Sequence, residues 1–546
     1  MAVDVLVLGT GAAGLTAALT AHGHGASVVV LEKGDKVGGT SAWSGGMIWI
    51  PNNPHMQRAG IEDSRETALG YLKALSHDLI DEQLAEAFVD AGPEMVSWLE
   101  ANTPVEFQPV AEFPDYHPEH PGGKPQGGRS LECKLFPYDE LGAAKDDVTV
   151  GHNYGTAPIT MEESNLGRAV PVQVAPEERA RRAERDERGC GQALIGRLYK
   201  GCLDRGIEVL TGHRAVSLAT QAGSVTGVTA QGPHGTVEFA VTGGVVLATG
   251  GFEWNRDLVR TFLRGPMTSP VSVPTNEGDG LTMCMRIGAA LGNMREAWWM
   301  PAVEVPADNG GTQIHLFAAE RARPRSIMVN RAGRRFTNEA ANYNAFGAAF
   351  HEQDVARFEY ANLPCWFLFD QEHLDTFGFI DTPPGAPAAN WVTSALTLRE
   401  LALKLEIDAD ELERTVARWN TFVENDSDAD FHRGESAHDN WWGDPGARGT
   451  PAATLGRLDT GPYYAVEVKS GALGTKGGPL TDLRARVQNV DGETIEGLYA
   501  AGNVMASVMG MTYGGAGGTL APGMVFGFIS GRDAAHRGKA ARLADA

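Results

Sequence analysis

The sequence predicts an α/β protein in which a Rossmann-like dinucleotide-binding domain is interrupted by an inserted α+β substrate or capping domain. Residues 3–32 and 498–503 are far apart, yet both predict parts of one nucleotide-binding sheet. A tryptophan-rich stretch of different composition lies between them. We therefore expect the dinucleotide-binding domain to consist of residues 1–281 and 451–546, with residues 282–450 forming the inserted substrate-binding domain.

The first 32 residues carry the strongest signal. An apolar run over residues 3–8 predicts a buried parallel strand. In the turn that follows, Gly9 permits a tight bend, Gly11 lets a phosphate approach the backbone, and Gly14 lets the next helix pack against the strand. Glu32 ends the following apolar strand, where a carboxylate can accept hydrogen bonds from a ribose. This pattern predicts a dinucleotide site with the pyrophosphate at the helix N-terminus.

A second glycine-rich run, residues 38–46, indicates which dinucleotide is bound. Its small residues let the backbone press against a flat ligand, and Thr40 and Ser41 can donate hydrogen bonds. The run resembles that of the FAD-binding flavoproteins of the fumarate reductase and succinate dehydrogenase superfamily. The resemblance implies FAD and a domain of the glutathione-reductase type. Relatives that bind FAD covalently use a histidine in this loop, and residues 40–44 contain none, which predicts non-covalent FAD.

Residues 47–110 predict mainly helices, whereas residues 111–185 are rich in Pro, Gly, His and charge and predict long loops of the kind that form lids. His117, Glu119 and His120 in this stretch could suggest a metal site. Because the Pro-rich spacing places them on no common helical face and no further ligands are obvious, we expect no metal.

The chain then returns to the pattern of the first domain. Residues 191–203 predict a helix, residues 245–249 a buried strand, and residues 520–534 the last helix. The motifs ATGGFE, NEGDG and LYAAGN extend the flavoprotein resemblance over nearly the whole chain. The resemblance implies that FAD contacts Gly9, Gly11, Ala13, Gly14, Glu32, Lys33, Gly39, Thr40, Ser41, Gly45, Gly46, Ala215, Thr249, Gly250, Asp279, Gly502, Asn503, Gly518, Thr519 and Leu520.

Composition narrows the class of protein. The net charge of −23 argues against nucleic-acid binding, which needs a basic face. The five cysteines form no C-x-x-C pair, which favours reduced thiols in a cytoplasmic protein. No apolar run is long enough for a transmembrane helix, and the first residues enter the nucleotide strand directly, which leaves no room for a signal peptide.

The residues that would face the flavin separate this chain from the fumarate reductases. That family holds a dicarboxylate with arginines and histidines, one arginine four residues after an Asn-Glu pair and another after a His-Gly pair. Here the matching positions hold Tyr343, Met509 and Tyr513. The site that is cationic in the fumarate reductases is apolar and phenolic in this chain. Such a site suits a ketone group on an otherwise apolar molecule.

The pattern resembles the 3-ketosteroid Δ1-dehydrogenases. The resemblance implies that Tyr343 is the base and Tyr116 its partner, and that Tyr513 and the N–H of Gly517 polarise the ketone. Tyr343 would remove the proton α to the carbonyl, while a hydride leaves the β carbon for flavin N5. Two donors at the ketone oxygen would stabilise the enolate, and a hydrogen bond from Tyr116 would lower the pKa of Tyr343. Met511 stands where a histidine is commoner, which bears on the substrate more than on the chemistry.

Other functions stay open from the sequence. The substrate could be a smaller ring ketone such as 4-oxocyclohexanecarboxylate, with Arg321, Arg323 or Arg325 as a distal cation if they do not simply lie on a solvated face. A Δ4-type ketosteroid dehydrogenase, a flavin-dependent alkene reductase, and a flavin-binding module without catalysis are further alternatives. The natural electron acceptor, a quinone or an electron carrier, is not specified by these motifs.

Overall fold

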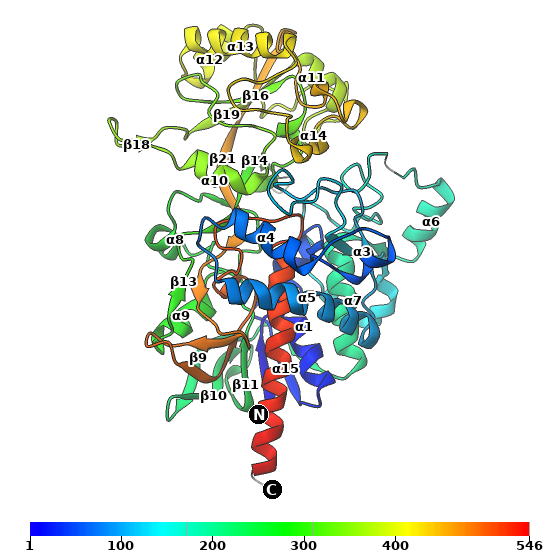
Figure 1. The fold of residues 1–546 in the computed structure, drawn as a ribbon, viewed down its shortest axis with the longest axis vertical. Coiled ribbons are helices and arrows are strands. Elements are labelled where there is room, and N and C mark those ends of the chain that lie inside the picture. The colour runs from blue at the N-terminus through cyan, green and yellow to red at the C-terminus, as the bar shows by residue number, and fades with distance from the viewer. Residues whose placement is uncertain (171, 308–309, 545–546) are drawn as a thin grey trace.

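The computed structural model describes residues 1–170, 172–307 and 310–544. Two sheets organise the chain, one in the lower and one in the upper half of Figure 1. The first is eight-stranded, with the core order β23-β24-β11-β1-β2-β8, and β10 and β9 extend it from β11. Its strands are β1 (Ala2–Leu8), β2 (Val28–Leu31), β8 (Glu208–Leu210), β9 (Arg214–Gln221), β10 (Ser224–Gly232), β11 (Gly235–Leu247), β23 (Arg486–Gln488) and β24 (Thr494–Ala500).

The centre of this sheet is parallel, because β1 pairs in parallel with both β2 and β11, and β11 pairs in parallel with β24. The residues of β1 from Asp4 onward are buried, as expected for a parallel strand covered on both faces. β24 lies some 250 residues beyond β11 in the sequence, so the chain leaves this domain and returns to it, as predicted.

Two helices pack together against this sheet: α1 (Ala12–Gly23) and the C-terminal α15 (Leu520–Ala544), which is longer than the predicted 520–534. Glycines make the close approach possible, since a Cβ on Gly527 would lie 2.4 Å from the carbonyl oxygen of Ala13, and one on Gly531 equally close to that of Ala17. The predicted helical region contains α3 (Pro54–Arg58), α4 (Arg65–Leu75) and α5 (Glu82–Asn102).

Residues 111–185, predicted as long loops, contain short elements within irregular backbone. These are β5 (Ser130–Cys133), β6 (Phe136–Pro137), η1 (Tyr138–Asp147) and α6 (Pro176–Glu184), after which β7 (Glu187–Arg188) leads into α7 (Cys190–Asp204). A three-stranded sheet of β3 (Ile48–Trp49), β5 and β4 (Phe107–Pro109) ties this region to the first domain.

The second sheet has the order β15-β14-β21-β19-β16, with β12 and β20 also paired to β21. Its strands are β12 (Ser269–Pro270), β14 (Ala297–Pro306), β15 (Thr312–Leu316), β16 (Ser326–Asn330), β19 (Cys365–Asp370), β20 (Thr393–Ala395) and β21 (Tyr463–Thr475). Its helices are α10 (Phe346–Phe350), α11 (Gln371–Phe377), α12 (Leu398–Leu405), α13 (Ala409–Glu424) and α14 (Ala437–Trp442). Since β21 is the central strand, the chain returns to the first domain after Thr475, later than the predicted residue 451.

All five cysteines are unpaired and buried. Within the three described ranges, every helix is too short or too polar to cross a lipid bilayer.

Candidate active site

One cavity extends between the two domains. Tyr116, Tyr343, Tyr513 and Gly517 line it, as do the predicted FAD contacts Gly9, Gly11, Ala13, Glu32, Lys33, Gly39, Thr40, Ser41, Gly45, Gly46, Ala215, Thr249, Gly250, Asp279, Gly502, Asn503, Thr519 and Leu520. Gly14 and Gly518 do not line it.

At one end of the cavity, the glycine turn forms the cradle expected for a pyrophosphate. Gly9 has a φ of +109°, and a Cβ there would lie 2.2 Å from the carbonyl oxygen of Ala248. A Cβ on Gly14 would lie 2.0 Å from the carbonyl oxygen of Gly9, so Gly14 acts by closing the helix onto the turn. Glu32 accepts hydrogen bonds from the N–H and hydroxyl of Thr10, at 3.1 and 2.5 Å, and this fixes its carboxylate beside the cradle.

The second glycine run lines the middle of the cavity. The hydroxyl oxygen of Ser41 accepts a hydrogen bond from the N–H of Ala12 at 3.1 Å, and that of Thr40 accepts one from Asn276 at 3.2 Å. Each hydroxyl therefore keeps its proton for a ligand. A Cβ on Gly46, which has a φ of +69°, would collide with the backbone of Cys190. These residues fit FAD, because a flat ring needs backbone at close range and donors at its edge.

Three tyrosines meet at the far end of the cavity, where the second domain closes over the first. The hydroxyls of Tyr116 and Tyr343 are 2.7 Å apart. The ring centroid of Tyr513 lies 5.0 Å from that of Tyr116 and 5.4 Å from that of Tyr343. Tyr343 begins the short helix η3 (Tyr343–Ala345), which Asn342 caps. All three rings are buried.

The loop that carries Tyr513 is fixed from the first domain. The carbonyl oxygen of Gly514 accepts hydrogen bonds from the N–H of Tyr116 at 3.0 Å and from the hydroxyl of Tyr71 at 2.7 Å. Thr519 donates to the hydroxyl oxygen of Tyr513 at 2.8 Å, so the tyrosine proton is free to point into the cavity. The N–H of Gly517 has no partner within the described residues. Two donors are therefore available for one carbonyl oxygen.

Burial sets the acidity of these groups. It raises the pKa of Tyr343 well above its ordinary value, and the neighbouring Tyr116 and Tyr513 raise it further. Burial likewise raises the pKa of Tyr116, although its hydrogen bond to Tyr343 and the charge of Arg321 act in the opposite direction. The predicted hydrogen bond between the two tyrosines is present, but in the free protein it does not lower the pKa of Tyr343.

Several residues near the tyrosines were not predicted as site residues from the sequence. His438 is fully buried, with its ring centroid 5.0 Å from that of Tyr116, and neither of its ring nitrogens has a hydrogen-bond partner among the described residues. Trp298 packs edge-on against Tyr513 at 4.9 Å, and Lys476 lies 4.2 Å from the centroid of Trp298. Only their position in the folded chain distinguishes these residues from other core residues.

The three arginines considered as a distal cation do not line the cavity. Arg325 forms a two-pronged ion pair with Asp370, and Arg323 donates to the carbonyl oxygen of Phe377 at 3.2 Å. Arg321 is 2% exposed, so the expectation of a solvated face is wrong for this residue.

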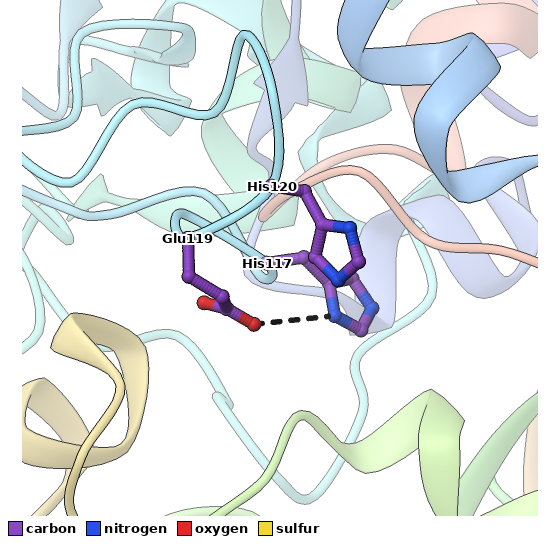
Figure 2. Close-up of side chains that lie close together, drawn as sticks. All are labelled: His117, Glu119 and His120. Atoms are coloured by element: carbon purple, nitrogen blue, oxygen red, sulfur yellow. Dashed lines mark ion pairs between the residues drawn. The ribbon is translucent and has the colours of Figure 1, made fainter.

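A tight turn brings His117, Glu119 and His120 together, although they share no helix (Figure 2). Their potential ligand atoms lie within 4.8 Å of one another, and Nδ1 of His117 is 4.0 Å from Oε1 of Glu119. Asn342 contacts the other ring nitrogen of His117 at 3.0 Å. These residues therefore lie close together without a shared helix, and the absence of a metal stays a prediction. Burial lowers the pKa of His117 to about 4, which favours the neutral ring.

Comparison with known proteins agrees with this geometry. The family model described as "FAD binding domain" matches residues 4–520. The chain is 41% identical over 538 residues to the 4-oxocyclohexanecarboxylate 2-dehydrogenase of Sinomonas cyclohexanicum, covering 97% of this chain and 92% of that protein. It is 38% identical over 559 residues to the 3-oxosteroid 1-dehydrogenase of Mycobacterium tuberculosis, covering 96% and 97%. The chain belongs to the FAD-binding flavoproteins of the ketosteroid dehydrogenase type.

A solved member of this family has the same fold. It is the 3-ketosteroid delta1-dehydrogenase from Sterolibacterium denitrificans in complex with 1,4-androstadiene-3,17-dione. It matches with a TM-score of 0.90 and 35% identity, over 98% of this chain and 99% of that one. The predicted fold and the assignment as an FAD-dependent oxidoreductase acting on CH–CH groups are confirmed.

Proposed function

We propose that the protein desaturates 3-ketosteroids between C1 and C2, with Tyr343 as the base and with Tyr513 and the N–H of Gly517 holding the ketone. The observation that carries this proposal is the convergence of the Tyr116–Tyr343 pair and two free donors on one cavity that also contains the dinucleotide cradle. A base and an oxyanion site on one ketone are what α-proton removal requires.

Each residue has a separate task in this proposal. Tyr513 and Gly517 donate to the ketone oxygen and make the α proton acidic. Tyr343 takes that proton, and Tyr116 hydrogen-bonds to the resulting phenolate. FAD supplies the acceptor for the hydride that leaves the β carbon.

The character of the cavity favours a neutral substrate. Around the tyrosines it is lined by Met47, Tyr154, Met161, Leu316, Ala318 and Trp442. Among the described residues that line the cavity, the one lysine or arginine is Lys33, which pairs with Glu277 and Asp279 at the dinucleotide end. An apolar steroid body fits these walls, whereas a carboxylate would be buried there without a cation.

A second candidate is dehydrogenation of 4-oxocyclohexanecarboxylate. The relative from Sinomonas cyclohexanicum, at 41% identity, favours it, and the chemistry at the ketone would be the same. The two candidates differ in what the far end of the cavity must accommodate, so substrate choice separates them directly.

We also propose that FAD is bound without a covalent link, which the absence of histidine from residues 40–44 supports. A quinone or an electron carrier would then reoxidise the protein. Acid precipitation should release all of the yellow colour into the supernatant, and colour retained by the pellet would contradict this part of the proposal.

The deciding experiment is anaerobic titration of the purified yellow protein with ketones while the visible flavin absorbance is recorded. The panel contains 4-androstene-3,17-dione, a 5α-saturated 3-ketosteroid, 4-oxocyclohexanecarboxylate and succinate. We expect bleaching by both steroids, with the new double bond between C1 and C2. Bleaching by 4-oxocyclohexanecarboxylate alone would indicate that this keto acid, and not a steroid, is the substrate, with the same chemistry at the ketone. A double bond at C4 would indicate a Δ4-type enzyme, and no bleaching by any ketone would overturn the proposal.

A further inference from the structure

A buried tyrosine base needs help that Tyr116 alone does not provide. During turnover Tyr343 must give up its own proton, yet burial opposes a negative charge on its oxygen. A nearby positive charge with no anion of its own would offset this cost. Arg321 has these properties.

Arg321 is attached to the segment that carries Tyr343. It lies on the short helix η2 (Glu320–Ala322). Its Nη1 donates to the carbonyl oxygen of Glu339 and, at 2.6 Å, to that of Ala341, two residues before Tyr343. Its guanidinium carbon is 4.6 Å from the ring centroid of Phe346, just after Tyr343 in the chain. The guanidinium group thus contacts the carbonyl oxygen of Ala341, before Tyr343 in the chain, and the ring of Phe346, after it.

The positive charge of Arg321 has no ion-pair partner among the described residues. Two other buried arginines in this region, Arg335 and Arg433, contact the carboxylate of Glu339 at 2.7 and 3.2 Å. In the described ranges of the chain, Arg321 has no carboxylate within 4.0 Å. A fully buried cation without an ion pair is costly to keep, so its retention here calls for a compensating role.

Other ionisable groups surround this site. Those that face Arg321, Tyr116 or Tyr343 are Glu320, Arg433, His438, Asp439, Tyr154 and Tyr513. Asp439 and Glu320 favour the charged form of Arg321, while burial lowers the pKa of Arg321 to about 10. Arg321 is therefore protonated at neutral pH. Burial lowers the pKa of His438, so its ring is neutral there and adds no second cation.

We propose that Arg321 is a positioning residue whose buried positive charge stabilises the deprotonated form of the Tyr116–Tyr343 pair. This inference rests on the proposed role of Tyr343 as base. It assigns Arg321 to the tyrosine pair rather than to a carboxylate of the substrate, because Arg321 does not line the cavity.

The first test follows tyrosine ionisation in the FAD-loaded protein without any ketone, by ultraviolet difference absorbance against pH. The signal of Tyr343 is isolated by subtracting the same titration of Y343F. In R321M we expect the ionisation of Tyr343 to move up by at least one pH unit, about a tenfold change in the ionisation constant. R321K, which keeps a positive charge, should stay near the wild type. An unshifted titration in R321M would overturn the proposal.

The second test uses anaerobic flavin reduction by 4-androstene-3,17-dione across the same pH range. At neutral pH the rate of flavin reduction by R321M should be about tenfold or more below that of the wild type. This rate should recover toward alkaline pH, because below the pKa of Tyr343 each unit of pKa changes the phenolate fraction tenfold. R323M is the matched control, since Arg323 is close in sequence and donates one hydrogen bond to a backbone carbonyl. An equal pH shift in R323M would refute a specific role for Arg321.

R321Q removes the same charge and keeps donors for the carbonyl oxygens of Glu339 and Ala341, so it replaces R321M if that variant does not fold. A slow R321Q with an unshifted pH profile would show a purely structural role and would overturn the proposal. Because the tyrosine titration needs no ketone, its outcome is independent of the substrate panel. Failure of the panel alone would refute the proposed function, and an unshifted titration alone would refute the role of Arg321.

Discussion

Replacing Tyr116 by Phe tests the tyrosine pair with little disturbance of the fold. The substitution removes one hydroxyl, which is 2.7 Å from the hydroxyl of Tyr343, and leaves the ring in place. The ring keeps its contacts with His438 and Tyr513, whose centroids are both 5.0 Å away. The N–H of Tyr116 also keeps its bond to Gly514. We expect the free energy of unfolding to fall by only about 1 kcal/mol.

The effect on proton abstraction should be larger. A hydrogen bond to a charged group contributes about 1.5–3 kcal/mol, so loss of the bond to the phenolate of Tyr343 corresponds to a rate roughly 10- to 150-fold lower. Because Tyr116 does not lower the pKa of Tyr343 in the free protein, the loss is expected in the rate at neutral pH. Stopped-flow measurement of anaerobic flavin reduction, with ordinary and α-deuterated 4-androstene-3,17-dione, gives both the rate and the isotope effect.

Y71F is the control for this experiment. Tyr71 lies on α4, and its buried hydroxyl donates to the carbonyl oxygen of Gly514, in the loop that carries Tyr513, at 2.7 Å. Within the described residues, no hydrogen bond or ring contact joins Tyr71 to Tyr343. Y71F should lower stability and leave the rate of flavin reduction near that of the wild type. A wild-type rate in Y116F, or an equal loss of rate in Y71F, would refute the assignment of Tyr116 as partner of the base.

Three further outcomes follow from the structure. Gly14→Ala places a Cβ 2.0 Å from the carbonyl oxygen of Gly9, so the purified variant should have lost most of its FAD; a wild-type flavin-to-protein ratio would contradict this. Glu339→Gln breaks a buried ion pair with Arg335, in which the oxygen–nitrogen distances are 2.7 and 2.8 Å. The free energy of unfolding, measured in urea, should fall by about 3–5 kcal/mol. A fall below about 1 kcal/mol would contradict this prediction. Burial lowers the pKa of Lys476 to about 7 in the folded protein. Between about pH 7 and pH 10 the unfolded chain therefore binds more protons than the folded protein does. The free energy of unfolding of the wild type should rise with pH across that window. K476M should lose this rise, and equal pH slopes in the two proteins would disprove the shift.

The sequence by itself determined the dinucleotide-binding half of the site, because the signals there are local. Gly9, Gly11 and Glu32 are placed by one strand–turn–helix–strand unit, whose backbone geometry demands these residue types at fixed spacing. The second glycine run acts in the same way, over a few consecutive residues. Such patterns can be interpreted without knowing what packs against them.

The tertiary structure alone decided how the charged and hydroxyl groups around the ketone site are arranged. Tyr116 and Tyr343 are 227 residues apart, and their hydrogen bond exists only because the second domain closes over the first. Arg321 resembles any surface arginine in the sequence, yet the fold buries it, and among the described residues no carboxylate lies within 4.0 Å of it. Local sequence patterns specify backbone shape, whereas burial and long-range contacts set the pKa values on which this chemistry depends.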